Sequence, residues 1–391
     1  MSLPLQGIRV LDLSRLLPGA YASQMLADYG ADVIKVEEPR TGDYARTMPP
    51  TDQNGINLYF QAINRNKRSM TLNLKTESGR ALFLRLVERA DVVLESFRPG
   101  VMARLGLAYE RLRAKRPELI YCAISGYGQD GPYSERAGHD LNYAGYAGLL
   151  HHLRDQEGRP MMPPTQFGDL VGGSYLAVIG ILTALLGRQQ TGEGRMIDVA
   201  MTEGLLSLLP LQIAAYLHTG KEPLPGRTSL TGDLPCYHIY ETKDGQFLTL
   251  GALEPKFWHA FCTRIGHLEL LPFHSPVGPD EREQALTILR NVFKTKTRDE
   301  WMAELGDLDS CVGPVYTLAE ALNDPQMQAR GVLFREAENA PPQLSTFPRL
   351  SDVPQTMRSK PPALGEHTSA ILQEYGFQVE AIEQFRKEGV I

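Results

Sequence analysis

The first 125 residues alternate short apolar runs, rich in β-branched side chains, with stretches of helical periodicity. Uninterrupted apolar strands between amphipathic helices are typical of a parallel sheet that helices cover on both faces. The pattern therefore predicts an α/β fold. Strands are expected at 8–13, 33–37, 69–74, 91–95 and 119–125, with helices at 20–29 and 76–89 between them.

The second half of the chain predicts a smaller α+β domain. A Pro- and Gly-rich segment, 220–230, follows a predicted strand at 196–200 and a helix at 203–218, and we interpret it as a domain linker. Two strands flanking a Lys-Asp-Gly turn then predict a hairpin, at 237–242 and 247–251. Helices are expected near 255–265, 281–294 and 298–305, followed by an extended proline-rich segment at 340–362 and two short helices.

Composition and charge exclude several classes of protein. The formal net charge of −6 argues against nucleic acid or an anionic membrane as the main partner. The four cysteines stand far apart without a C-x-x-C pair, so we expect a reduced, cytoplasmic protein and no disulfide framework. The N-terminus lacks a signal-peptide pattern. The stretch 170–186 carries no charge, but it is shorter than the ~20 residues of a membrane span and predicts a buried core helix.

A glycine-rich motif, G-x-G-x-x-G at 126–131, directly follows a predicted strand. A dinucleotide-binding fingerprint also needs a helix that starts at the third glycine and a later carboxylate for the ribose. Pro132 and a polar stretch follow Gly131 instead. The motif therefore predicts a ligand-proximal loop and not an NAD site.

Two basic clusters stand at the ends of predicted strands. Arg65, Lys67, Arg68 and Lys75 flank the strand at 69–74, and the strand at 91–95 is followed by Arg98 and Arg104. Ligands of open α/β sheets bind at strand ends, and guanidinium groups suit phosphate geometry. Solvated surface charge is the alternative for each residue taken singly.

Three residues are candidates for catalysis: His139, Asp169 and Glu254. Asp169 directly precedes the uncharged helix, where it can act as a helix N-cap, and capping is the favoured interpretation from sequence alone. In a functional role, backbone N–H groups after Asp169 would stabilise developing negative charge. Glu254 precedes Pro255 and can likewise be a helix-start carboxylate. The spacing of the three fits no metal-ligand motif.

Read together, these segments resemble CoA-transferase family III (the CaiB/BaiF group), which joins CoA-transferases with α-methylacyl-CoA racemases. The matching blocks include LDLSRLLPGAYASQMLADYGADVIKVEEP, NRNKRSMTLNLK, FRPGVMARLGL, SGYGQDGPY and CVGPVYTLAEAL. The resemblance implies a Rossmann-like large domain (1–220, joined by a C-terminal segment, 335–391), a small domain (221–334) and an interlocked homodimer. CoA is the expected ligand, with no other cofactor and no metal.

The resemblance also implies roles for individual residues. Arg98 would contact the CoA nucleotide, and the further candidates for CoA contact are Arg104, Arg65, Lys67, Gly138 and Asp140. Glu38 stands where relatives often carry an arginine that touches CoA, which is a departure from the family pattern.

Racemases and transferases of the family differ in how they use the aspartate that matches Asp169. In transferases it is a nucleophile that forms an aspartyl-CoA thioester, and in racemases it is an acid/base. Racemases also carry a histidine in a G-H-D-[IL]-N-Y block, matched by His139, and a glutamate in G-A-[IL]-E-P, matched by Glu254. We therefore predict a 2-methylacyl-CoA racemase that moves the α-proton between two bases, with a type III CoA-transferase as the alternative.

Overall fold

The chain forms two compact units in the computed structural model, which describes residues 3–51, 57–155, 157–276, 278–336 and 342–391. The first unit comprises Met1–Leu149, Met162–Leu209 and Gly331–Ile391, and the second comprises Leu150–Met161 and Pro210–Arg330. After the short earlier segment Leu150–Met161, the chain passes into the second unit again at Pro210, where a new helix begins, before the boundary predicted near residue 220. It returns to the first unit at Gly331, a few residues before the predicted boundary.

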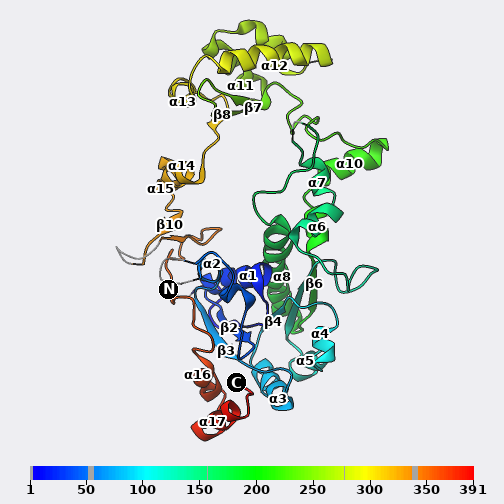
Figure 1. Ribbon diagram of the computed structural model, residues 1–391, viewed down its shortest axis with the longest axis vertical. Coiled ribbons are helices and arrows are strands. Elements are labelled where there is room, and N and C mark those ends of the chain that lie inside the picture. Colours follow the sequence, from blue (N-terminus) through cyan, green and yellow to red (C-terminus); the bar gives the residue numbers. More distant parts are fainter. Residues whose placement is uncertain (1–2, 52–56, 156, 277, 337–341) are drawn as a thin grey trace. The chain divides into compact units, whose positions relative to one another are not determined.

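A six-stranded parallel sheet forms the centre of the first unit (Figure 1), with the order β3-β2-β1-β4-β5-β6. The predicted α/β class is confirmed. Chain order runs outward in both directions from the neighbours β1 and β4, and such a switch point is where open α/β sheets bind ligands. The strands are β1 (Arg9–Asp12), β2 (Asp32–Glu37), β3 (Lys67–Thr71), β4 (Val92–Glu95), β5 (Ile120–Ser125) and β6 (Met196–Ala200).

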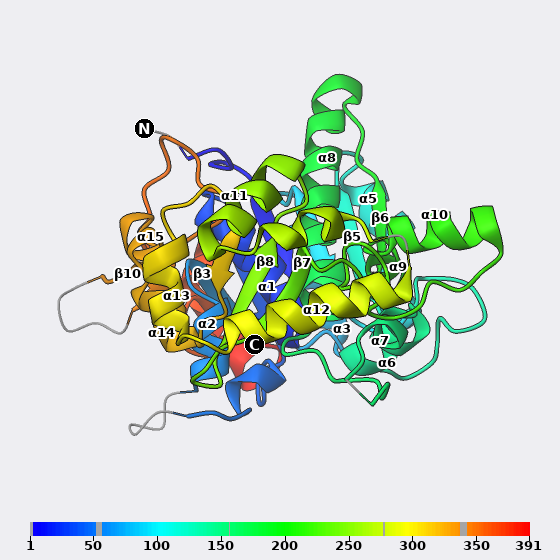
Figure 2. The ribbon, with the colours of Figure 1, turned by 90° about the horizontal axis from the view of Figure 1, so that it is seen from above.

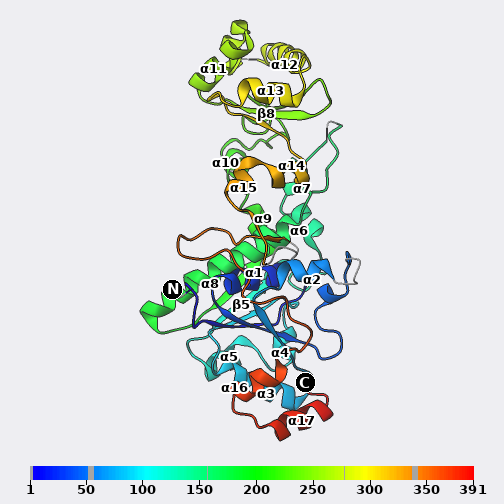
Figure 3. The same ribbon diagram turned by 90° about the vertical axis from the view of Figure 1, so that its left-hand side faces the viewer.

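Helices cover both faces of this sheet (Figures 1 and 3). One face carries α1 (Leu16–Asp28) and α8 (Leu176–Thr191), and the other carries α3 (Glu77–Val87), α5 (Tyr109–Lys115) and α16 (Thr368–Glu374). Leu11, Phe83 and Ile371 are all 0% exposed in one apolar core, so segments from both ends of the chain share it. The other elements of this unit are η1 (Tyr44–Arg46), α2 (Leu58–Ile63), α4 (Val101–Arg104), α6 (Asp140–Tyr146), α9 (Met201–Leu206), α17 (Val379–Lys387), β10 (Leu333–Phe334) and β11 (Gln343–Leu344).

The uncharged stretch departs from a regular core helix. It begins as a π-helix, η2 (Gly168–Tyr175), which continues into α8. A Cβ on Gly172 would lie 2.5 Å from the carbonyl oxygen of Met201, so glycine allows the π-helix to approach the backbone of α9. By length and composition η2 and α8 together could cross a membrane. Ala177 and Ile181 are buried, but Ile179 and Leu186 are 58% and 61% exposed, so only one face of α8 is core.

The second unit is a small α+β fold. Strands β7 (Tyr237–Glu241), β8 (Phe247–Gly251) and β9 (Val312–Pro314) form an antiparallel sheet, and the predicted hairpin is confirmed. Helix α12 lies beside β7 (Figure 2). The helices are α10 (Pro210–Thr219), α11 (Pro255–Ile265), α12 (Pro279–Phe293), α13 (Arg298–Leu305), α14 (Leu318–Asn323) and α15 (Pro325–Ala329), with η3 (Leu268–His274); α7 (Leu149–His152) lies at the boundary of the units.

The helix predicted at 203–218 is divided into α9 and α10. Pro210 has no backbone N–H and its ring would clash with the preceding turn, so it can begin a helix but does not continue one.

Candidate active site

A pocket of about 190 Å³ lies at the carboxyl ends of β1, β4 and β5. It therefore occupies the switch point of the sheet. Four residues predicted from the sequence to belong to the site line it together: Arg98, Gly138, His139 and Asp169. Arg98 comes from the loop after β4, Gly138 and His139 from the loop before α6, and Asp169 from the first turn of the π-helix.

Asp169 is not a helix N-cap, so the interpretation favoured from sequence is wrong. The N-cap position of the π-helix is Phe167, and Asp169 lies inside the first turn. Its backbone N–H donates to the Oδ1 atom of Asp140, at 3.0 Å. Burial, and to a lesser extent the nearby Asp140 carboxylate, raises the pKa of Asp169 from 3.8 to about 7. A carboxyl group with this pKa exchanges protons readily near neutral pH.

Asp140 does not itself line the pocket, but it contacts Asp169, which does. A Cβ on Gly168 would lie 2.8 Å from Asp140 Oδ1, so the glycine provides the room for this contact. Asp140 was predicted to contact CoA. Its hydrogen bond positions the first turn of the π-helix, and its negative charge adds to the effect of burial in raising the pKa of Asp169.

Two backbone N–H groups at the start of the π-helix, those of Asp169 and Leu170, already have hydrogen-bond partners. The N–H of Asp169 donates to Asp140, and that of Leu170 donates to the carbonyl oxygen of Gln166 at 2.9 Å. Of the N–H groups after Asp169 that were predicted to stabilise developing negative charge, that of Leu170 is therefore already paired in this conformation.

His139 occupies the N-cap position of α6 and is exposed at the pocket. Its backbone N–H donates to Asn142 Oδ1 at 3.0 Å. The hydroxyl of Tyr143 donates to the carbonyl oxygen of Gly138 at 2.5 Å, and the rings of Tyr143 and Tyr127 meet edge to face at 5.2 Å. A Cβ on Gly138 would lie 2.7 Å from Tyr143, so glycine and aromatic packing together determine the path of this loop.

Sequence reasoning missed two further arginines that line this pocket, Arg15 and Arg136. Arg136 stacks on Tyr133, with its guanidinium carbon 4.0 Å from the ring centre. Arg15 follows the end of β1, so the strand-end argument that selected Arg98 could also have found it. Arg15 and Phe97 also line a second pocket, of about 230 Å³, beside the ends of β2 and β3.

Glu38 and Lys75 line this second pocket too. The backbone N–H of Thr41 donates to the Glu38 carboxylate at 2.8 Å, and such hydrogen bonds lower the pKa of Glu38 to about 2. The pocket therefore contains a fixed negative charge where relatives are expected to carry an arginine.

Two of the predicted CoA contacts are buried structural groups. Arg65 forms a bidentate ion pair with Asp28, at 3.0 and 2.6 Å. Lys67 is 1% exposed and donates to the carbonyl oxygen of Ala20 and to Asn64 Oδ1, at 2.7 and 2.8 Å. Burial lowers the pKa of Lys67 to about 7. Neither cation lines either of the two pockets at the strand ends, so their geometry does not support the prediction that they contact CoA.

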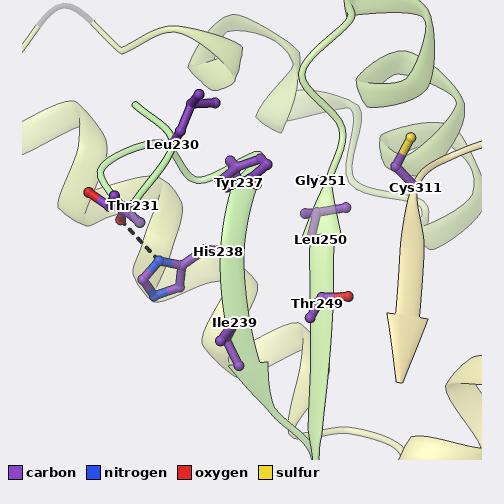
Figure 4. Close-up of a pocket in the computed structure, with 10 residues that line it drawn as sticks. Leu230, Thr231, Tyr237, His238, Ile239, Thr249, Leu250, Gly251 and Cys311 are labelled. Atoms are coloured by element: carbon purple, nitrogen blue, oxygen red, sulfur yellow. Dashed lines mark hydrogen bonds between the residues drawn. The ribbon is translucent and has the colours of Figure 1, made fainter. Parts of the chain in front are cut away.

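Arg104 lies exposed on α4 and lines neither pocket. Glu254 belongs to the second unit, where it is the exposed N-cap residue of α11. Burial, and to a lesser extent the Glu254 carboxylate, raises the pKa of Cys311, which lines a largely apolar pocket of about 530 Å³ in that unit (Figure 4). Strands β7 and β8 supply most of this lining, including Tyr237 and Leu250. Within the described residues, no cluster of His, Cys, Asp and Glu is arranged to hold a metal.

This fold and site define an enzyme of CoA-transferase family III, and the chain belongs to that family, whose sequence model matches residues 5–368. The chain is similar to alpha-methylacyl-CoA racemase of Homo sapiens, with 34% identity over 99% of this chain and 97% of that protein. It is also similar to succinate–glutarate CoA-transferase of Agrobacterium fabrum, with 36% identity over 97% of each chain. The crystal structure of a CAIB/BAIF family protein from Brucella suis matches with a TM-score of 0.83 and 36% identity, over 96% of this chain and 100% of that one.

The family resemblance is thus confirmed. Racemases and transferases match at similar identity, so the comparisons support an acyl-CoA enzyme without separating the two reactions.

Proposed function

We propose that the protein is a racemase of 2-methylacyl-CoA thioesters, with His139 and Asp169 as its two bases. The observation that carries the proposal is that both side chains line one pocket and that the pKa of Asp169 is about 7. A two-base racemase needs one group that accepts the α-proton and a second, protonated group that returns one to the other face. Histidine and a carboxyl of raised pKa can each act in either role near pH 7.

In one direction a basic Asp169 removes the α-proton, and the electron pair of the broken C–H bond moves into an enolate. Protonated His139 then delivers its proton to the opposite face of the same carbon. In the reverse direction the two groups exchange roles. No proton is gained or lost overall, and each turnover leaves the two bases with exchanged protonation states.

The CoA moiety would lie across the two pockets that share Arg15 and Phe97. Arg98 is exposed at the first pocket and suits the anionic phosphates of CoA. We also propose a catalytic role for Glu254, which stands in the block that matches racemases. We further propose the interlocked homodimer and a cytoplasmic location. An exposed apolar face that runs from the end of η2 along α8 supports a partner surface, because Tyr175, Ile179, Leu182 and Leu186 recur there at helical spacing.

The second candidate is a type III CoA-transferase in which Asp169 is a nucleophile. The transferase relatives support it, because they are about as similar to this chain as the racemases are. In that reaction the Asp169 carboxylate attacks the thioester carbonyl and expels the CoA thiolate. The thiolate then attacks the resulting anhydride to form an aspartyl-CoA thioester and release the first carboxylic acid.

Proton NMR in heavy water separates the two reactions. A stereochemically pure 2-methylacyl-CoA, incubated with the protein and no second acid, should lose its α-proton signal as deuterium enters. The His139→Ala variant is the matched control, since it removes one base and should slow this exchange. Retention of the α-proton, together with transfer of CoA to an added carboxylate and hydroxylamine trapping at Asp169, would establish the transferase instead.

A further inference from the structure

The corner between β1 and α1 is strained at the point where it enters the pocket. Leu16 has a φ of +60°, a left-handed conformation that a residue with a branched side chain rarely adopts. Leu16 and its neighbour Arg15 both line the pocket beside Asp169. A strained backbone persists only where surrounding contacts hold it, so the contacts of this corner are informative.

Asp43 supplies the contact to the strained residue. Its Oδ1 atom accepts hydrogen bonds from the backbone N–H groups of Leu16 and Ala45, at 3.0 and 2.9 Å. Its Oδ2 atom lies 2.7 Å from the ammonium nitrogen of Lys35. Asp43 is 1% exposed and Lys35 is fully buried. The carboxylate is therefore held in one orientation by a buried cation and by two backbone donors.

Lys35 holds the other side of the same corner. Its ammonium group donates to the carbonyl oxygen of Ser14 at 3.0 Å. The buried pair thus contacts the residue before Arg15 and the residue after it. Arg15 itself is tied through its backbone N–H to Ser96 Oγ, at 3.1 Å, which joins the corner to the loop after β4.

Tyr44, which follows Asp43 in the chain, also contacts the side chain of Arg15. The guanidinium group donates to the hydroxyl of Tyr44 at 2.9 Å, and its carbon lies 4.9 Å from the centre of the Tyr44 ring. The same carbon lies 5.6 Å from the ring of Phe97. Arg15 therefore lines both pockets. Its guanidinium group is held by Tyr44 and Phe97.

We propose that Asp43 is a positioning residue for ligand binding: with Lys35 it holds the strained Arg15–Leu16 corner so that the Arg15 guanidinium group meets an anionic, phosphate-bearing part of the ligand. The inference rests on the proposed acyl-CoA substrate. Asp43 itself does not touch the ligand. Its effect on binding passes through Arg15, so substitutions at the two positions should not be additive.

The test is the affinity for free CoA, measured by titration calorimetry on the full-length protein. Asp43→Asn preserves the shape but sets an amide against the Lys35 ammonium, and Arg15→Ala removes the proposed ligand contact. Each should weaken CoA binding by about tenfold, as expected for loss of a charge-assisted hydrogen bond. The double variant should be no weaker than Arg15→Ala alone. Asp28→Asn is the matched control, since it disturbs another buried ion pair of the first unit and should leave CoA affinity unchanged.

A second variant covers the case in which Asp43→Asn does not fold. Tyr44→Phe removes one exposed hydroxyl and should lower CoA affinity about fivefold, again with no added effect in the Arg15→Ala background. The proposal would be overturned if folded Asp43→Asn bound CoA with unchanged affinity. If Asp43→Asn does not fold, unchanged CoA affinity in Tyr44→Phe would overturn it. Losses of affinity that add to that of Arg15→Ala in the double variant would also overturn it. If the wild-type protein failed to bind CoA at all, the proposed function would fail instead, and the two failures are therefore distinguishable.

Discussion

Replacing Asp169 by asparagine should stabilise the fold while it abolishes turnover. The pKa of this carboxyl is raised from 3.8 to about 7, with burial as the larger cause and Asp140 as the smaller. The folded state therefore retains a proton that the unfolded chain loses between pH 4 and 7. Across that interval the unfolded state binds fewer protons, so the stability of the wild-type fold declines as pH rises.

The size of the effect follows from the same pKa. Each pKa unit corresponds to about 1.4 kcal/mol, so a pKa near 7 in place of 3.8 corresponds to about 4 kcal/mol for a fully buried group. Asp169 is partly exposed at the pocket, and solvent screening there reduces this to about 2 kcal/mol. We therefore expect Asp169→Asn to be more stable than wild type by about 2 kcal/mol at pH 8, and equal to it near pH 3.5.

Urea unfolding followed by far-ultraviolet circular dichroism measures this difference at each pH. Both tryptophans, Trp258 and Trp301, lie in the second unit, so tryptophan fluorescence alone would not report on the unit that contains Asp169. A difference in stability that does not change between pH 3.5 and 8 would refute the raised pKa, and substantial turnover by the variant would refute the catalytic role.

Three further substitutions test the site. Arg98→Ala should raise KM for acyl-CoA about tenfold with little change in kcat, because a contact remote from the reacting carbon contributes mainly to binding; unchanged CoA affinity in calorimetry would remove Arg98 from the site. His139→Ala should slow α-proton exchange at least 100-fold, measured by NMR in heavy water, and should affect CoA transfer to an added acid less; equal losses would count against two-base racemisation. Gly168→Ala should reduce kcat with normal CoA binding, because its Cβ would lie 2.8 Å from Asp140 Oδ1 and displace the carboxylate that contacts Asp169; wild-type kcat would show that this contact is dispensable.

Local sequence determined the elements of the fold. The apolar run that became β1 lies between polar positions, and burial of such a run on both faces requires covering helices, so the parallel sheet followed from the pattern alone. Helices α11 and α13 begin and end where their periodicity predicted. The break before Pro210 had a readable local signal as well, since proline cannot continue a helix.

The sequence also determined which side chains could serve as bases, because His139 and Asp169 stand in short blocks that resemble the family. The protonation behaviour of Asp169 was decided by tertiary structure. Asp140 lies 29 residues away along the chain, and the local sequence predicted an N-cap where the fold forms a π-helix. Burial and a neighbouring carboxylate act through space, so they have no local sequence signature.

The same reason explains the basic residues. Three cations stand at strand ends: Arg65, Lys67 and Arg98. Arg65 is paired with Asp28, and Lys67 is buried close to Asp12. Arg98, in contrast, is exposed at the pocket. The partners lie 37 and 55 residues away in the chain. Whether a charge is neutralised inside the protein or left free for a ligand depends on which distant segment folds against it, and only the tertiary structure decides that.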